Sequence, residues 1–366
     1  MDINAYICKP KQREMVKDIF SKRLKSVRIM KGMSLRDLHV GINEAVSVNA
    51  LSKYEQGKMF PNSKVLIAIS KALDVPMDDL LRPVSVCIDP EKVKYRKKAK
   101  LGKKEQASIN NLVSISLEKY IEVERMCGES KRFDLSFTDV EVSTYEDAVC
   151  VASRFRSALC LGNAPIVNPI NLLEGEGVKF IEIDAPETFD GDSFTVDDSF
   201  VIVLNKLSCT ERIRMSLFHE IGHKVMRFSD RINEKEEEKL CTAFANEVLL
   251  PSSVFVENIG MKRKDITIDE LRSLQVTYGI SIDAMMYKAK SIGIISEKRY
   301  MTYCIKKNSS AEYKNEATKS MYGKEKSYRF RNLVCRLYAN EEITISKCAS
   351  LLGCSASDVM ENIKFV

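Results

Sequence analysis

The sequence feature that most constrains the fold is a five-residue motif near the middle of the chain, His219-Glu220-Ile221-Gly222-His223. In a helix, its two histidines lie one turn apart on the same face. Apolar residues recur at helical spacing on another face of this stretch: Ile213, Leu217, Phe218, Ile221 and Val225. We therefore expect a helix that buries its apolar face and presents both histidines to a cleft. The spacing of Ser208 and Glu211 predicts a capping box at its start.

Two imidazoles on one helical turn can bind a single zinc ion, and the intervening glutamate can act on a metal-bound water. Such a site needs a third protein ligand, and the one remaining histidine, His39, lies far away in the sequence. The next predicted helix offers carboxylates: Glu234, Glu236, Glu237, Glu238 and Glu247. We favour Glu238, with water as the fourth ligand, and interpret the neighbouring glutamates as a solvated helix start.

Two alternatives to this assignment stay open. Cys241 is a competing soft ligand, although a lone buried cysteine more often serves packing. The histidines themselves can also be an incidental pair on a solvated helix, because a motif match alone carries a risk of error.

The residues that follow the motif extend this pattern into a resemblance to a known family. The run is Glu238, Cys241, Phe244, Ala245, Leu249, Leu250 and Pro251. Together with the motif it resembles the ImmA/IrrE metallopeptidases. The resemblance implies that His219, His223 and Glu238 bind zinc and that Glu220 is the general base. Many members carry Ala-Asn where this chain has Cys241-Thr242, a departure that leaves the implied ligand set intact.

The sequence pattern of residues 14–82 predicts a compact helical unit. In this unit Ser34 and Ser47 cap successive helices, and Gly57 ends the helix that Ser47 begins. The stretch LSKYEQGK and the later PNSKVLIAISKALDVPMDDLL resemble the XRE/Cro-like helix-turn-helix domain. The resemblance implies that Val48–Gln56 is the recognition helix and that its first residues enter the major groove of double-stranded DNA. The expected DNA-binding residues are Ser47, Val48, Asn49, Ser52, Lys53 and Lys58.

These DNA-binding residues have distinct expected partners. Asn49 suits an adenine edge, Val48 suits a thymine methyl group, and Lys58 suits a phosphate. Two departures affect docking: Leu35 stands where the family usually has a glutamine, and the turn before Ser47 is longer than usual. We expect DNA binding as a homodimer. The alternative is a helix-turn-helix used only for protein contacts.

The sequence predicts an α+β fold that is mostly α: an all-α helix-turn-helix domain followed by a zincin-like helical domain with a small β-sheet. The expected divisions are residues 1–85 for DNA binding, 86–127 for a basic connector and helix, 128–305 for the peptidase domain, and 306–366 for a linker and C-terminal helical module. Strands are expected over 178–184 and as a pair within 189–205. We interpret 308–326 as a polar linker, and the C-terminal helices as a packing or partner module.

Composition bears on where such a chain works. No run of 18 apolar residues is present, and the first 15 residues lack an apolar signal region, so we expect neither a membrane span nor export. The 11 cysteines are scattered without a Cys-x-x-Cys pair, which favours reduced thiols in the cytoplasm. The net charge of +6 is modest, so its distribution matters more than its total.

Three functions fit this sequence. The first is a DNA-binding regulator whose zinc-dependent endopeptidase domain hydrolyses a peptide bond in a protein partner, a transcriptional repressor in a stress or mobile-element circuit. The second is a non-catalytic DNA-binding repressor or antitoxin whose peptidase-like domain binds a partner or senses a signal. The third is a structural zinc protein. Glu220 favours the first over the third, because a structural site needs no base and is usually closed by four protein ligands.

Overall fold

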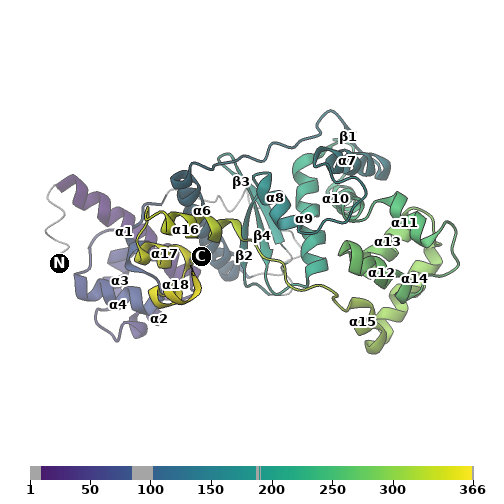
Figure 1. The fold of residues 1–366 in the computed structure, drawn as a ribbon. Helices are drawn as coiled ribbons and strands as arrows, with labels where there is room; N and C mark the ends of the chain where they lie inside the picture. Colours follow the sequence, from purple (N-terminus) through teal and green to yellow (C-terminus); the bar gives the residue numbers. More distant parts are fainter. Residues whose placement is uncertain (1–9, 85–101, 187–188, 190, 365–366) are drawn as a thin grey trace. The chain divides into compact units, whose positions relative to one another are not determined.

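A computed structural model describes residues 10–84, 102–186, 189 and 191–364 of the chain (Figure 1). These residues form two compact units. The first unit contains the described residues up to 131 and those from Tyr328 onward, and the second contains residues 132–327. The chain therefore leaves the first unit after α6 and returns to it for its last three helices. The basic connector predicted from the sequence falls largely on 85–101, outside the described residues.

The first unit begins with five helices that enclose one small core. The helices are α1 (Pro10–Met30), α2 (Leu35–Gly41), α3 (Val48–Glu55), α4 (Ser63–Leu73) and α5 (Met77–Leu81). Ser34 caps α2 through a capping box with Asp37, and Ser47 caps α3, as the sequence predicts. The core consists of side chains that recur at helical spacing, among them Phe20, Leu24, Leu38, Leu51, Leu66, Ile69 and Leu73.

The long helix α6 (Lys103–Cys127) links these helices to the C-terminal ones, α16 (Arg329–Ala339), α17 (Ile345–Leu352) and α18 (Ala356–Asn362). Val123 of α6 lies in one buried cluster with Leu333 and Leu337 of α16. The Lys119 ammonium donates to Asp79 and to the Ser350 carbonyl, each at 2.8 Å, and so joins α5, α6 and α17. The C-terminal helices thus pack as part of the unit that holds the helix-turn-helix.

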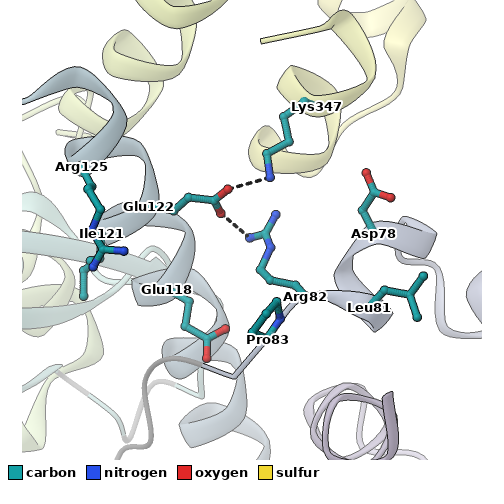
Figure 2. A pocket seen from close by; sticks show the side chains of 9 residues that line it. All are labelled: Asp78, Leu81, Arg82, Pro83, Glu118, Ile121, Glu122, Arg125 and Lys347. Atoms are coloured by element: carbon teal, nitrogen blue, oxygen red, sulfur yellow. Dashed lines mark hydrogen bonds and ion pairs between the residues drawn. The ribbon is translucent and has the colours of Figure 1, made fainter. Parts of the chain in front are cut away.

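A pocket lies where α5, α6 and α17 meet (Figure 2). Its centre is the Glu122 carboxylate, which accepts a hydrogen bond from Lys347 at 2.8 Å and pairs with Arg82 at 3.4 Å. The nearby Glu118 is paired with the buried guanidinium of Arg23 at 2.8 Å. These alternating charges join α6 to α1, to the end of α5 and to α17.

The second unit contains a three-stranded sheet with the order β2-β4-β3. β2 (Lys179–Ile183) is parallel to β4 (Ser199–Asn205), and β3 (Gly191–Val196) is antiparallel to β4. This arrangement confirms the predicted strand and the predicted strand pair. Opposite residues in the β3/β4 register, such as Ser193 and Ile202, share a face of the sheet. A second, two-stranded sheet joins β1 (Glu141–Val142) to β5 (Arg227–Phe228) in parallel.

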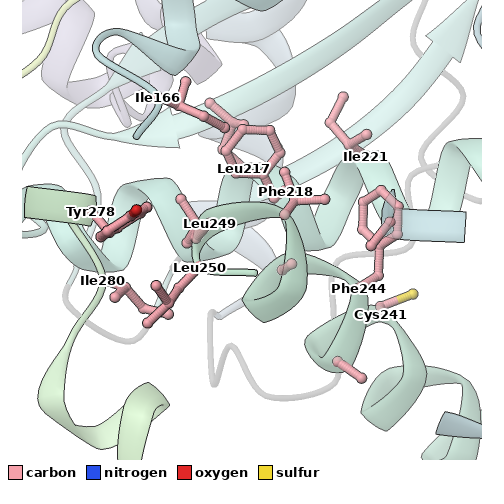
Figure 3. Packing of buried hydrophobic residues seen from close by; sticks show 14 of the residues in the cluster. Ile166, Leu217, Phe218, Ile221, Cys241, Phe244, Leu249, Leu250, Tyr278 and Ile280 are labelled. Atoms are coloured by element: carbon pink, nitrogen blue, oxygen red, sulfur yellow. The ribbon is translucent and has the colours of Figure 1, made fainter. Parts of the chain in front are cut away.

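Nine helices complete the described part of the second unit. They are α7 (Tyr145–Ala158), α8 (Pro169–Gly175), α9 (Thr210–Val225), α10 (Glu234–Leu249), α11 (Ser252–Ile259), α12 (Ile268–Tyr278), α13 (Ile282–Ser291), α14 (Glu297–Ser309) and α15 (Ala311–Thr318). Two of them, α8 and α9, pack against the three-stranded sheet. The core lies between α7, α9 and α10, where Phe155 contacts Phe218 and Phe244 edge-on. Figure 3 shows Phe218 of α9 and Phe244 of α10 in this core. This packing fixes the position of α9 relative to α10.

Part of the segment that we expected to be a polar linker is helical, because α14 extends to Ser309 and α15 follows at once. The polar composition misled the interpretation, since α15 is mostly exposed and buries only Ala317. Residues 319–327 do run without regular structure. They cross the beginning of α9, where Glu211 accepts hydrogen bonds from the Met321 amide at 2.9 Å and from the Ser320 hydroxyl at 2.6 Å.

The capping box predicted at the start of α9 is wrong. The N-cap residue is Cys209, which makes no side-chain capping bond, and the helix begins at Thr210. The carboxylate of Glu211 is instead buried against residues more than 60 positions away in sequence, including the Gln275 amide at 2.8 Å. The Glu211 carboxylate therefore makes tertiary hydrogen bonds and does not cap the helix as the local pattern predicts.

Candidate metal centre and nucleic-acid interface

The two motif histidines lie on α9 as the spacing predicts, and their side chains meet. The Nε2 atoms of His219 and His223 are 3.2 Å apart. His219 is buried, whereas the side chain of His223 is 23% exposed, so the pair is accessible from one side. The apolar face of α9, with Leu217, Phe218 and Ile221, is buried in the core and holds the helix in place.

Glu238 reaches the same point from α10. One carboxylate oxygen lies 3.5 Å from Nε2 of His219, and the other lies 3.3 Å from Nε2 of His223. α10 starts at a capping box between Asn233 and Glu236, which sets the helix so that Glu238 faces α9. The three residues that we proposed as ligands are therefore together in space.

The separations among these three groups fit a zinc ion. Ligand atoms about 2.0–2.1 Å from a tetrahedrally coordinated zinc stand roughly 3.3 Å from one another. The observed separations between the two Nε2 atoms and the Glu238 oxygens are 3.2, 3.3 and 3.5 Å. These distances join four electron-rich atoms, the two Nε2 atoms and both oxygens of Glu238, and a cation between them would stabilise the cluster.

Hydrogen bonds on the far sides of the two rings support the same conclusion. The Thr242 hydroxyl donates to the Glu238 carbonyl at 2.8 Å, so at 3.3 Å it accepts from Nδ1 of His219. Nδ1 of His223 donates to the Glu237 carboxylate at 3.1 Å. These contacts suit the tautomer in which each ring carries its proton on Nδ1 and turns the Nε2 lone pair inward, as in metal-binding histidines.

Sequence reasoning missed these two supporting residues. Glu237 was grouped with solvated carboxylates, yet it orients His223. Thr242 was noted only as a departure from the family pattern. Their positions in the sequence could have indicated this role. Glu237 directly precedes the proposed ligand Glu238, and Thr242 lies one helical turn after it.

The predicted general base, Glu220, is 5% exposed and follows His219 directly on α9. Its carboxylate accepts a hydrogen bond of 2.7 Å from the hydroxyl of Ser193 on β3. Ser193 was not predicted, because the contact spans 27 residues and depends on how the sheet packs against α9. Two residues further along β3, the Thr195 hydroxyl lies 3.5 Å from the Lys224 ammonium of α9. Ser193 and Thr195 therefore both contact side chains of α9.

Cys241 is a second candidate for the third ligand. One ligand atom each from His219, His223 and Cys241 lie within 4.8 Å of one another. The Glu238 oxygens lie 3.3 and 3.5 Å from the histidine nitrogens, which matches the spacing that zinc requires. We therefore keep Glu238 as the proposed third ligand for zinc, with Cys241 as the alternative donor.

In the first unit, the proposed recognition helix α3 buries Leu51 and Tyr54 and turns its other side outward. Asn49, Lys53 and Lys58 are exposed, whereas Val48 and Ser52 are half-buried. Ser47 is exposed and its hydroxyl accepts from the Ala50 amide at 3.2 Å, so its side chain is used in capping. The geometry is compatible with DNA contacts by these residues, and their individual roles stay predictions.

The turn before α3 is held by contacts within the unit. Nδ1 of His39 lies 2.8 Å from the Val46 carbonyl oxygen, so this third histidine fixes the approach to α3. Asn43 and Glu44 both have positive φ, which accommodates the longer turn that the sequence indicates. Leu35 packs against the core instead of offering the polar contact that is usual at this position.

Each unit has one feature that indicates its class. The first unit has two capped helices, the second of which faces outward, and the second unit has a His-Glu-x-x-His helix faced by a glutamate. Comparison with known families gives the particular assignments. Residues 24–80 match the helix-turn-helix family, and residues 173–290 match the IrrE N-terminal-like domain of the M78 peptidases. These matches confirm both resemblances seen in the sequence. The search of curated proteins returned no match for the chain.

The chain therefore has a region that matches a DNA-binding helix-turn-helix and a second region that matches a metallopeptidase family, and this combination supports a DNA-binding regulator. Within the part of the chain that the structure describes, no helix is both long enough and apolar enough to span a membrane.

Proposed function

We propose that this protein is a cytoplasmic DNA-binding regulator whose second unit is a zinc-dependent endopeptidase acting on a protein partner. The observation that carries the proposal is the convergence of His219, His223 and Glu238 within 3.5 Å of one another, beside the buried Glu220. A site of this kind leaves a fourth position for water, which distinguishes a catalytic from a structural zinc centre.

A zinc ion bound here would lower the pKa of a bound water toward ~7 and polarise the scissile carbonyl. Glu220 would accept the proton of that water and deliver it to the leaving amine. The Ser193 hydroxyl donates to one oxygen of Glu220 and so fixes the direction of its carboxylate. Glu237 and Thr242 fix the two histidine rings, as described above, so that the reacting groups are oriented before a substrate arrives.

The strand β3 suits the binding of an extended peptide. Among the described residues it pairs on one side only, with β4, and it is therefore an edge strand. Ser193 places this edge next to Glu220, and an added peptide strand would run past the catalytic groups. The alternative is that β3 only completes the sheet.

The first unit would direct the protein to DNA. We propose that α3 enters the major groove, with Asn49 and Val48 reading bases and Lys58 contacting phosphate. A transcriptional repressor is our proposed substrate, because a DNA-binding domain places the peptidase where repressors act. The choice of a repressor as the substrate rests on the family resemblance and on the attached helix-turn-helix. The residues of the proposed zinc site do not indicate a particular substrate.

The test of this function is Glu220→Gln, which keeps the size of the side chain and removes the base. Each repressor encoded near this gene would be co-expressed with the wild type or the variant, and shortened products would be sought by mass spectrometry. We expect cleavage to fall by roughly a hundredfold or more while zinc content stays unchanged. Glu257→Gln, at an exposed position of α11, is the matched control.

Two results would count against the proposal. Equal cleavage by wild type and Glu220→Gln would remove Glu220 from the mechanism. No cleavage by either protein, together with normal transcriptional control by the variant, would favour the non-catalytic regulator.

A further inference from the structure

Cys241 is a feature of the metal centre that zinc-dependent hydrolysis does not use. It lies on α10, three residues after Glu238, and its side chain is fully buried. Its sulfur and one nitrogen from each of His219 and His223 lie within 4.8 Å of one another. The two histidines are thus shared by two candidate third ligands on successive turns of α10, one a carboxylate and the other a thiol.

The packing of α9 on α10 holds Cys241 close to the histidines. Gly222 lies between the two histidines in sequence, and a Cβ there would come within 3.4 Å of the Cα of Cys241 and 3.2 Å of the Phe244 ring. The helices approach so closely at this turn that a side chain at Gly222 would require its neighbours to shift by a few tenths of an ångström. Figure 3 shows Cys241 and Phe244 together on α10 in this tightly packed region. The thiol is therefore fixed beside the histidine pair by the core.

We propose that His219, His223 and Cys241 form a binding site for a thiophilic cation, such as Cd²⁺ or Cu⁺, that overlaps the zinc site. Thiolate and imidazole ligands select soft metals, whereas carboxylates suit harder ones. The inference rests on the metal centre of the proposed function and adds to it a second class of ligand. Because both sites use the same histidines, a thiophilic cation displaces the zinc that Glu238 holds.

Binding at this site is coupled to proton release. The buried thiol gives its proton to the solvent as the sulfur coordinates the cation, and no electron transfer is needed. Little water competes for the cation, because His219 and Cys241 are both buried. The protein would therefore lose its hydrolytic zinc on exposure to soft metals, which makes the centre a point of control by metal supply.

The experiment uses the full-length chain freed of metal, with Cd²⁺ as the probe. Thiolate-to-cadmium absorption in the ultraviolet reports sulfur coordination, and a zinc-binding dye reports zinc affinity independently. The variants are Cys241→Ala and Cys241→Ser, with Cys150→Ser at an exposed position of α7 as the matched control. His219→Ala removes a ligand common to both sites.

We expect both Cys241 variants to lose the histidine-dependent part of the cadmium absorption and to bind Cd²⁺ about tenfold or more weakly, while zinc affinity stays within about threefold. Cys150→Ser should change neither signal. Circular dichroism and thermal melting of both Cys241 variants check that they fold, and a result from either folded variant decides the question.

Three outcomes are distinguishable. Loss of the cadmium signal in the Cys241 variants with zinc binding retained supports the inference. An unchanged cadmium signal in these variants, with zinc still bound, overturns the inference and leaves the proposed zinc centre standing. If the wild type and His219→Ala bind zinc and cadmium equally, the metal centre itself is wrong and the inference is wrong with it.

Discussion

The proposed metal centre and the proposed recognition helix are both built on helices, but they place their functional side chains in opposite ways. On α9 and α10 the functional groups are largely buried, and residues far away in sequence orient them: Ser193 holds Glu220 across 27 positions. On α3 the proposed functional residues face outward, and the helix is set by local contacts such as the cap at Ser47. The comparison shows that a reacting group needs support from several elements, whereas a group that reads DNA needs mainly a correctly placed helix.

The largest effect is expected from removing a metal ligand. His219→Ala or Glu238→Ala should lower zinc affinity by about a hundredfold or more, since each removes a direct ligand, whereas Glu237→Gln should cost about tenfold through the orientation of His223. Competition with a zinc-binding dye measures all three. Equal affinities for Glu237→Gln and Glu238→Ala would contradict the assignment of Glu238 as the ligand.

The second effect concerns the orientation of the base. Ser193→Ala should lower the rate of cleavage by roughly tenfold or more without reducing zinc content, because Glu220 loses the donor that fixes its carboxylate. Ser193→Thr keeps a hydroxyl and should restore much of the rate. The measurement is cleavage of the repressor identified by co-expression, alongside elemental analysis. A rate unchanged in Ser193→Ala would show that α9 alone orients Glu220.

Substitutions in the recognition helix should act on DNA and leave the metal centre untouched. Asn49→Ala should reduce discrimination at one base pair by about 1–3 kcal/mol, whereas Lys58→Ala should weaken binding to all sequences similarly and reduce its dependence on salt. Titrations of full-length protein with selected and scrambled duplexes at several salt concentrations separate the two. Selection from genomic fragments that enriches no sequence would favour a role in protein contacts.

The smallest effect is expected from the cap of α3. Ser47→Ala removes the side-chain acceptor for the Ala50 amide and should lower the free energy of unfolding of the first unit by about 1 kcal/mol. Urea denaturation followed by helical circular dichroism measures it, with Ser47→Asn as a variant that keeps a capping group. A loss of DNA binding much larger than the loss of stability would show that Ser47 also contacts DNA.

The sequence predicted those parts of both regions that depend on local patterns. Helical spacing placed His219 and His223 together, and the caps at Ser34 and Ser47 are where they were expected. It did not predict Ser193 beside Glu220, because that contact requires the packing of a sheet edge on a helix. It assigned Glu211 to a cap, whereas tertiary hydrogen bonds from residues 275, 320 and 321 hold that carboxylate.

The path of the chain has a practical consequence for anyone who wishes to test the two proposed activities separately. Segments from the first and the last parts of the described chain belong to the first unit, so a single truncation after α6 leaves that unit without α16, α17 and α18. It removes α16 and leaves Val123 without the leucines that cover it. Keeping the whole first unit requires excising residues 132–327 and rejoining the remaining segments with a short linker, which treats the second unit as an insertion in the first.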